Sequence, residues 1–371
     1  MKILHVAESA QGGVGTYLSE ILQEQSQQLG MNNVRALIPD RHAAHVSVDR
    51  RLIATWRRPG RSPASIVMLA AALRREIAAF QPTVVHAHSS VAGVVVRQMY
   101  GWRKRPFSIV YCPHGWAFDR SNATLSNGLV AVIERNLASA ADRIVVISEH
   151  ERQAALRIGI KPERLALVLN GIADQPPAPP ARWEDDRLKV LFIGRLDAQK
   201  GFDTLLDAVE PLKDRVSLRV IGKAVAGPAP RLRGHRDQVE YLGWRSLPEI
   251  SMEIAAADVV AMPSRHEGFG LVAIEAMRGG RAVVASAVGG LREIVVDGET
   301  GFLISPDNPE ALMRALIARD KAGWHAMGRA GRERFAAMFT GERMNRELLA
   351  LYRTLDTGHE QAAPVGMAAH A

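Results

Sequence analysis

The chain has 371 residues, of which 47% are hydrophobic and 23% charged, and its formal net charge is +8. This length and composition indicate a globular protein with room for two domains, and they exclude a disordered or collagen-like chain. Its one cysteine, Cys112, excludes an internal disulfide and a cysteine-rich metal site.

The sequence also lacks the usual signals for a membrane-spanning or exported protein. No apolar run approaches the length of a transmembrane helix, and the first residues enter a strand without the pattern of a signal peptide. We therefore expect a cytoplasmic protein.

The first half of the chain alternates predicted strands with helices. Apolar runs of buried type predict strands at Lys2–Val6, Val34–Ile38, Val84–His86, Ser108–Tyr111, Arg143–Ile147 and Leu165–Leu169. Such alternation is typical of a parallel, doubly wound sheet. A proline-rich segment from Asp174 to Pro180 then interrupts the pattern, because successive prolines remove backbone donors and favour extended chain.

A second series of the same kind follows the prolines. Its predicted strands are Val190–Ile193, Ser217–Ile221, Val239–Leu242, Val259–Met262, Ala282–Ser286 and Gly301–Ile304. We predict an α/β protein with two Rossmann-like, doubly wound domains facing a cleft, at residues 1–173 and 188–339, joined by a linker at 174–187. The stretch from Trp324 to Leu355 reads as helical, and residues 357–371 are expected to form a disordered tail.

A glycine-rich turn, Gly12-Gly13-Val14-Gly15, follows the first predicted strand and opens a helix. Turns of this kind also begin dinucleotide-binding domains. The dehydrogenase fingerprint, however, needs a further glycine where this chain has Leu18. An NAD-dependent oxidoreductase is therefore a distant alternative.

Two cations follow the first predicted strand of the second half, in Gly194-Arg195-Leu196 and Lys200-Gly201. Side chains at this end of a doubly wound strand face the ligand crevice. Arg195 and Lys200 can therefore neutralise two phosphates. No clear Asp-x-Asp motif lies between the strands, so we expect neither a metal nor a cofactor.

Two glutamates, Glu267 and Glu275, have seven residues between them around a glycine-containing turn. The strand before the turn ends at Pro263, and a helix is predicted at Leu271–Arg278. Glu267 then lies on the loop and Glu275 within the helix. The backbone amides of Phe269, Gly270 and Leu271 would lie at the helix N-terminus, which favours an anion.

One histidine, His114, follows a strand and precedes a glycine in Tyr111-Cys112-Pro113-His114-Gly115. Its place at a strand end again faces the crevice. We interpret the neighbouring Cys112 as a small buried residue rather than a nucleophile. His86 and His88 flank the end of another strand and could line an acceptor site, but we favour a structural role for both.

Taken together, these motifs resemble those of the retaining glycosyltransferases of family 4, which have the GT-B architecture. The matching pieces are Gly12-Gly13-Val14-Gly15, Pro113-His114-Gly115, Val146-Ile147-Ser148, Asn170-Gly171-Ile172, Gly194-Arg195-Leu196 with Lys200-Gly201, and the segment Glu267 to Glu275. They follow the family order from about Met1 to Tyr352, and the C-terminal half matches more specifically.

The resemblance implies a retaining, metal-independent enzyme that transfers a sugar from a nucleotide-diphosphate sugar to a lipid-linked or polysaccharide acceptor. It places His114 and Glu267 at the reacting sugar. The residues that it implies for donor binding are Gly13, Arg195, Lys200, Phe269, Gly270, Leu271 and Glu275. It also implies a C-terminal crossover helix, at about 340–356, that returns to the first domain. A catalytically inactive sugar-nucleotide-binding protein on the same fold is the closest alternative.

The positive charge is uneven, with +9 on residues 1–183 and −1 on residues 184–371. It is densest from Arg50 to Arg75 and at Arg103-Lys104-Arg105, with Trp56 and Trp102 nearby. This mixture suits an anionic membrane surface, which would make the protein peripheral at the inner membrane face. An ordinary basic face, with Ile66, Leu69, Leu73 and Ile77 of a helix in the core, explains it equally well. No nucleic-acid motif accompanies the charge, so we expect no nucleic-acid partner.

Overall fold

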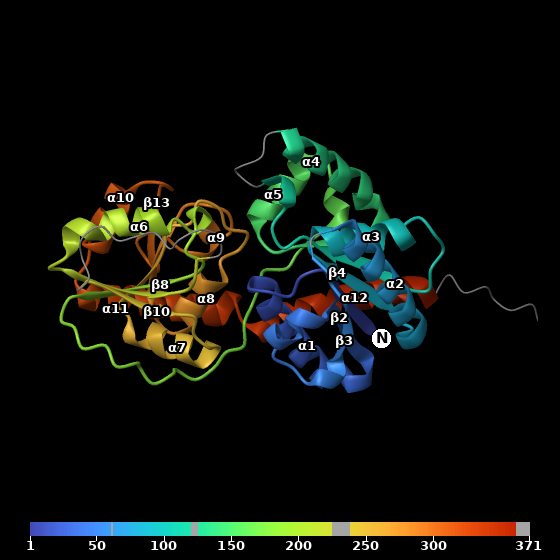
Figure 1. Cartoon of the computed structure of the whole chain (residues 1–371), viewed down its shortest axis with the longest axis horizontal. Helices are drawn as coiled ribbons and strands as arrows, with labels where there is room; N and C mark the ends of the chain where they lie inside the picture. Colours follow the sequence, from blue (N-terminus) through green and yellow to red (C-terminus); the bar gives the residue numbers. More distant parts are fainter. Residues whose placement is uncertain (61, 120–124, 225–237, 361–371) are drawn as a thin grey trace, which may run out of the picture. The chain divides into compact units, whose positions relative to one another are not determined.

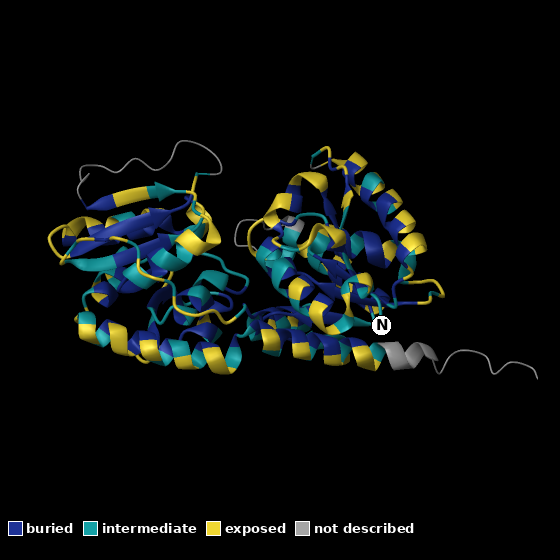
Figure 2. Ribbon diagram, turned by 90° about the horizontal axis from the view of Figure 1, so that it is seen from below, coloured by how far each residue is buried: buried dark blue, intermediate teal, exposed yellow. Residues whose placement is uncertain are grey.

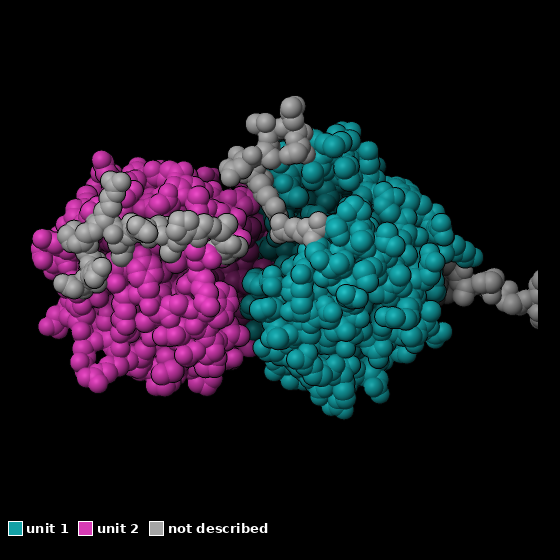
Figure 3. Space-filling view, viewed as in Figure 1, with its two compact units in different colours: residues 1–147, 151–169, 341–371 teal, residues 148–150, 170–340 magenta. Residues whose placement is uncertain are grey.

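The computed structural model of the chain describes residues 1–60, 62–119, 125–224 and 238–360. They form two compact units, coloured separately in Figure 3. Unit 1 comprises residues 1–147, 151–169 and the chain from Gly341 onward, and unit 2 comprises residues 148–150 and 170–340. Of the predicted disordered tail at 357–371, residues 357–360 are helical instead, and residues 361–371 lie outside the described residues.

Unit 1 is built on a parallel sheet. Its strands are β1 (Ile3–Ala7), β2 (Val34–Pro39), β3 (Ile53–Trp56), β4 (Val84–His88), β5 (Ser108–Cys112), β6 (Arg143–Val146) and β7 (Leu165–Leu167). Among the described residues their order is β3-β2-β1-β4-β5-β6-β7 (Figure 1). The helices of this unit are α1 (Gly13–Leu29), α2 (Pro63–Phe80), α3 (Ser90–Tyr100), α4 (Leu125–Leu137), α5 (Glu149–Arg157) and α12 (Gly341–Glu360).

Unit 2 repeats this plan with a second parallel sheet. Its strands are β8 (Leu188–Ile193), β9 (Val216–Ile221), β10 (Val239–Gly243), β11 (Val259–Met262), β12 (Ala282–Ser286) and β13 (Gly301–Ile304), in the order β10-β9-β8-β11-β12-β13. Its helices are α6 (Phe202–Val209), α7 (Leu247–Ala256), α8 (Leu271–Arg278), α9 (Leu291–Ile294), α10 (Pro309–Leu316) and α11 (Lys321–Met338). In Figure 1, α6 and α10 cover one face of this sheet and α7 and α8 the other.

Both sheets have a point where the strand order reverses. In unit 1, β2 pairs with one side of β1, and β4 later pairs with the other side. In unit 2, β9 and β11 flank β8 in the same way. At such a switch point the two crossovers diverge, so the carboxyl ends of the central strands stay uncovered. The strand order therefore predicts one ligand crevice in each unit, at the carboxyl ends of its central strands.

The predicted fold class, two Rossmann-like doubly wound domains, is confirmed. The predicted strands all form, with ends shifted by at most two residues. Sequence reasoning missed β3, whose residues are mostly half-buried or exposed and so lack an apolar run. The helical stretch from Trp324 to Leu355 is two helices, because the chain breaks at Phe339 and Thr340, where Thr340 forms a bridge with Ile172.

The C-terminal helix α12 follows unit 2 in sequence but belongs to unit 1. It runs to Glu360, four residues past the predicted end of the crossover helix. Figure 2 shows α12 with buried residues along one side and exposed residues along the other. Met344, Leu348, Leu349 and Tyr352 are each at most 1% exposed, so the helix supplies part of the core of unit 1.

This arrangement predicts that Leu348→Ala destabilises unit 1 but leaves unit 2 unchanged. Removing a fully buried leucine side chain costs about 2–5 kcal/mol through lost burial and a cavity. Peptide-resolved hydrogen exchange should show lower protection in β1 and β4 and unchanged protection in β8 and β11. Arg346→Ala is the control, since the Arg346 side chain is 66% exposed. Equal loss of protection in both units would contradict the assignment of α12 to unit 1.

Candidate functional site

In unit 2, the loops after β8 and β11 meet at the switch point. The loop after β8 carries Arg195 and Lys200, and the loop after β11 carries Glu267. Hydrogen bonds between main-chain groups join the two loops, since the Arg265 N–H donates to the Gln199 carbonyl at 2.9 Å. The sheet thus brings together two motifs that are about seventy residues apart in sequence.

Glycines on the loops after β8 and β12 allow these loops to pack closely against the loop after β11. At Gly289, with φ of +50°, an added Cβ would lie 1.7 Å from the Glu267 carbonyl oxygen. At Gly201, with φ of +63°, it would lie 1.9 Å from the Pro263 carbonyl oxygen. No other residue type fits at either position, because both the backbone conformation and the space exclude a side chain. The main chain around Glu267 is therefore held in place from both sides.

The central polar contact of this site joins Lys200 to Glu267. The Lys200 ammonium lies 2.5 Å from the Glu267 carboxylate, and their side chains are only 19% and 15% exposed. The Ser264 hydroxyl donates to the same carboxylate oxygen at 3.3 Å. Two residues that we predicted for different parts of the donor thus form one ion pair.

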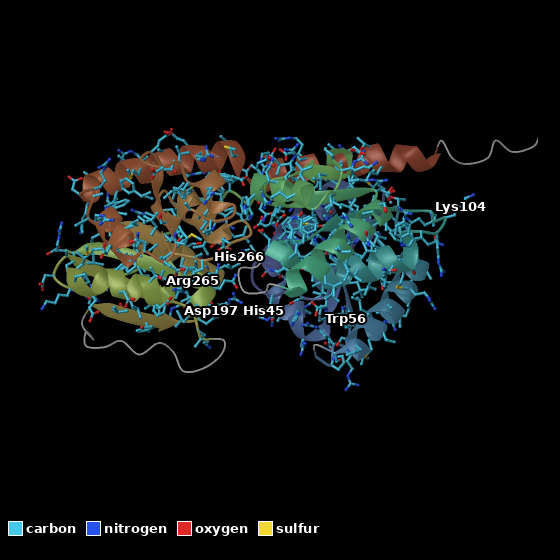
Figure 4. All side chains as sticks on the ribbon, turned by 90° about the horizontal axis from the view of Figure 1, so that it is seen from above. His45, Trp56, Lys104, Asp197, Arg265 and His266 are labelled. Atoms are coloured by element: carbon cyan, nitrogen blue, oxygen red, sulfur yellow. The ribbon has the colours of Figure 1, made fainter. Side chains whose placement is uncertain are left out.

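The second predicted cation, Arg195, is more accessible, with 45% of its side chain exposed. It lies 3.1 Å from the Asp197 carboxylate and donates to the Gln199 side-chain oxygen at 2.8 Å. Figure 4 marks Asp197 together with Arg265 and His266 in this region of unit 2. Arg265 forms a bidentate pair with Asp203 at 2.7 and 2.8 Å, so it braces the loop rather than facing a ligand.

Helix α8 begins at Leu271, four residues after Glu267. Its N-cap is Gly270, with φ of +115°, and Phe269 before it is buried. The backbone amides at this end, including that of Leu271, are placed to favour an anion. Glu275 is half-buried and lies one turn further into the helix. The site residues predicted in unit 2 therefore all lie in the segments that follow β8 and β11.

In unit 1, Gly13 and His114 also lie near the switch point. Gly13 is exposed and begins α1 after β1, while His114 is half-buried and follows β5. His114 has φ of +53°, a left-handed conformation that is uncommon for a residue with a side chain. The neighbouring Gly115 amide donates to Glu151 at 2.5 Å, which helps to hold this turn.

His114 does not stand alone but joins a cluster of buried histidines. His5 on β1 and His86 on β4 are paired in register, and His88 lies two residues after His86 on the same face of the sheet. His114 Nε2 lies 2.9 Å from His88 Nδ1, and His88 Nε2 lies 3.1 Å from His5 Nδ1. His5, His86 and His88 are all fully buried.

Burial keeps these imidazoles neutral. It lowers the pKa of His5 to about 4 and that of His114 to about 3. It also lowers the pKa of His86 and His88 well below the usual value. Neutral imidazoles are metal ligands, and ligand atoms of His5, His86 and His88 lie within 4.8 Å of one another. Both nitrogens of His5 and of His88 are, however, already hydrogen-bonded.

Sequence reasoning missed several members of this cluster. His5 Nε2 lies 2.9 Å from the Gln25 side-chain oxygen, and His86 Nδ1 lies 2.6 Å from the Tyr352 hydroxyl. Tyr17 packs edge-on against His114, with 4.6 Å between ring centroids. The alternation of His86 and His88 within an apolar strand was the one signal in the sequence. The buried environment of Cys112 is confirmed, and burial raises the pKa of its thiol.

The basic surface predicted for unit 1 needs correction. Trp56 is 3% exposed, and Arg58 is 9% exposed and ion-paired with Glu8, so neither can reach a membrane. In α2, Leu69 and Leu73 are buried as predicted, whereas Ile66 is 48% exposed. Arg61 lies outside the described residues. None of the described helices combines the length and the apolar character needed to span a membrane.

Two family models match the chain. "Glycosyl transferase 4-like domain" matches residues 12–171, and "Glycosyl transferases group 1" matches residues 187–319. A D-inositol 3-phosphate glycosyltransferase of Geodermatophilus obscurus is 33% identical over 337 residues, covering 78% of this chain and 71% of that protein. An uncharacterized 41.2 kDa protein in the cps region of Klebsiella pneumoniae is 26% identical, covering 95% and 100%.

The fold is also shared with solved structures. The Anabaena protein HepE, in a complex with UDP-glucose, superimposes with a TM-score of 0.78 at 22% identity, covering 95% of this chain and 100% of that one. This likeness shows the GT-B fold.

The histidine cluster predicts that unit 1 loses stability in mild acid. In the unfolded chain the imidazoles titrate near 6.5, whereas in the folded chain His5 and His114 titrate near 4 and 3. Between these values the unfolded chain binds protons that the folded chain excludes. Stability is therefore lost as the pH falls below about 6.5, by about 1.4 kcal/mol per pH unit for each such histidine.

Hydrogen exchange between pH 7.5 and 4.5, corrected for the chemical exchange rate, measures this loss in each unit. Unit 2 is an internal control, because its described histidines, His150, His266 and His325, are not buried. A parallel loss of protection in both units would contradict the prediction.

Proposed function

The chain belongs to the family 4 glycosyltransferases, and from this premise we propose that it is a retaining, metal-independent enzyme using a nucleotide-diphosphate sugar. The acceptor that we propose is a lipid-linked or polysaccharide chain. The Lys200–Glu267 pair carries the proposal, because it places a cation and a carboxylate together at the switch point. Family membership leaves the oxidoreductase without support, and hydrolysis or transfer of the donor sugar distinguishes an enzyme from an inactive sugar-nucleotide-binding protein.

In this proposal the donor diphosphate binds at the ends of β8 and β11. Arg195 and Lys200 meet its negative charge, helped by the amides at the start of α8. Glu275, within α8, accepts hydrogen bonds from the ribose hydroxyls, since one carboxylate can accept from two adjacent donors. The bound nucleotide in a HepE structure, UDP-glucose, supports a nucleotide-sugar donor here.

The proposed reaction takes place on one face of the sugar. The bond from the anomeric carbon to the phosphate oxygen breaks, and the bond to the acceptor oxygen forms. The acceptor proton passes to the departing diphosphate, whose charge Lys200 and Arg195 stabilise without a metal. Glu267 stabilises the positive charge that develops on the sugar, and His114 orients a sugar hydroxyl while neutral.

A membrane-bound acceptor fits part of the exposed surface of unit 1. Arg50, Arg51 and Arg57 are exposed, and Lys104 projects into solvent in Figure 4. Trp102 beside Lys104 is 61% exposed. Basic residues near an indole ring suit an anionic membrane surface, which supports a peripheral location at the inner membrane face as part of the proposal.

We predict that Lys200→Met and Arg195→Met each lower kcat/KM by about 10²–10³-fold, because each removes a cation that stabilises the leaving group. Thermal shift against UDP, GDP and ADP sugars first identifies the donor, and initial rates then measure turnover. Arg314→Met is the control, since this arginine in α10 is 66% exposed. Activity should persist in EDTA. Loss of activity in EDTA that Mg²⁺ restores would overturn the metal-independent mechanism.

The two glutamates should affect different kinetic quantities. Glu275→Gln should raise the Kd of the nucleotide more than it lowers kcat, because the ribose does not change during the reaction. Glu267→Gln should lower kcat without raising Kd, because it removes the carboxylate that stabilises the charge developing on the sugar and leaves Lys200 able to bind the diphosphate. Calorimetry gives Kd and saturating rates give kcat, with Glu310→Gln on the exposed face of α10 as the control. If Glu275→Gln mainly lowered kcat and Glu267→Gln mainly raised Kd, the roles that we propose for the two glutamates would be exchanged.

A further inference from the structure

Buried polar side chains of unit 1 form one chain of hydrogen bonds from His114 to helix α12. We propose that this chain fixes His114 as the tautomer with a proton on Nε2, so that Nδ1 accepts a hydrogen bond from a hydroxyl of the bound sugar. The proposal rests on the proposed function, because the ligand of His114 is the donor sugar. Gln25 and Asn345 are then positioning residues that act through three imidazoles.

The contacts are continuous from one end to the other. His114 Nε2 contacts His88 Nδ1 at 2.9 Å, His88 Nε2 contacts His5 Nδ1 at 3.1 Å, and His5 Nε2 contacts the Gln25 side-chain oxygen at 2.9 Å. Gln25 Nε2 then lies 3.3 Å from Asn345 Oδ1. Finally, Asn345 Nδ2 donates to the Gly341 carbonyl oxygen at 3.0 Å.

The last contact sets the direction of all the others. A backbone carbonyl can only accept, so Asn345 must turn its NH₂ group toward Gly341 and its oxygen toward Gln25. Gln25 must then donate to Asn345 through Nε2, which leaves its oxygen to accept from His5. The reverse orientation would bring the Asn345 oxygen against the Gly341 oxygen within buried surroundings, where repulsion between two acceptors is costly.

The histidines transmit this direction because each neutral imidazole has one proton. His5 donates from Nε2 to Gln25, so its Nδ1 accepts from His88 Nε2. His88 Nδ1 in turn accepts from His114 Nε2. A protonated imidazole would donate from both nitrogens and break the order, and burial lowers the pKa of His5, His88 and His114 enough to prevent this.

The remaining nitrogen of His114 is the only end of the chain open to a ligand. Among the described residues, no hydrogen-bond partner contacts His114 Nδ1, and the residue is half-buried. The left-handed backbone of His114, at φ of +53°, and the edge-on packing of Tyr17 hold the ring in this orientation. The lone pair on Nδ1 can accept a hydrogen bond from a hydroxyl group. A negatively charged phosphate oxygen has no hydrogen to donate and would not bond to it.

A bound metal ion is the competing interpretation of the same residues. It would need a free lone pair on one ring nitrogen of His5 and one of His88, but both nitrogens of each residue are already engaged in the hydrogen-bonded chain. The two interpretations therefore predict different protonation of the same nitrogens, and one spectrum separates them.

The test is a long-range ¹H–¹⁵N correlation spectrum of the full-length protein labelled with ¹⁵N-histidine, recorded at pH 7 without ligand. Signals are assigned with single histidine variants. We expect His5, His88 and His114 each to carry its proton on Nε2. A proton on Nδ1 of His114, or a mixture of tautomers, would overturn the proposal, as would one equivalent of zinc per chain by elemental analysis. The tautomers are read from the spectrum of the wild-type protein, and the histidine variants serve only to assign its signals.

Gln25→Met then tests the role of the positioning residue. It removes the acceptor for His5, so His114 should lose its single tautomer and kcat should fall about tenfold, the value of one hydrogen bond. The nucleotide Kd should not change. Gln28→Met is the matched control, because Gln28 lies one turn later on α1 and is exposed. An unchanged His114 spectrum in Gln25→Met would overturn the proposal.

The outcomes separate this inference from the proposed function. If no UDP, GDP or ADP sugar gives turnover but His114 is the expected tautomer, the proposed function fails and the hydrogen-bonded chain stands. If turnover is found and His114 carries its proton on Nδ1, the proposed direction of the hydrogen bonds is wrong, while the proposed function stands.

Discussion

The divergence of crossovers at the switch point of each sheet is the constraint on which the rest of this protein depends. The strand order reverses between β1 and β4 and between β8 and β11, and crossovers that diverge at such a point leave the carboxyl ends of these strands open to a ligand. Polar side chains that follow these strands can therefore be held by buried backbone and still meet a ligand. The histidine cluster of unit 1 and the Lys200–Glu267 pair of unit 2 both use this position.

The Lys200–Glu267 pair is a demanding arrangement for a protein interior. Withdrawing two charges from water is costly, and their mutual attraction offsets this cost only when the geometry is good. The 2.5 Å contact and the Ser264 hydroxyl supply that geometry. An incoming diphosphate would compete with Glu267 for the same ammonium. Donor binding would thus release the carboxylate toward the sugar, which couples binding to the catalytic arrangement in the proposed function.

Sequence reasoning could predict the parts of this structure that follow from local pattern. Strands buried on both faces read as apolar runs, which is why β8 and β11 were found, whereas the half-exposed edge strand β3 was not. The close approach of Lys200 and Glu267 follows from neighbouring strand ends, but their ion pair depends on rotamers that no pattern specifies. Trp56 and Arg58 looked like surface residues because their burial depends on tertiary contacts with distant parts of unit 1.

The histidine chain was the least predictable feature, since its members range from His5 to Asn345 and only the fold brings them together. Its composition nevertheless has a physical logic. A neutral imidazole can donate and accept at once, so it extends a hydrogen-bonded chain through a buried layer without burying a charge. Lysine or aspartate at these positions would require a counter-ion. Through the histidines, Asn345 on α12 can therefore determine the tautomer of His114 at the crevice of unit 1. It does so although the polypeptide reaches α12 only after it has completed unit 2.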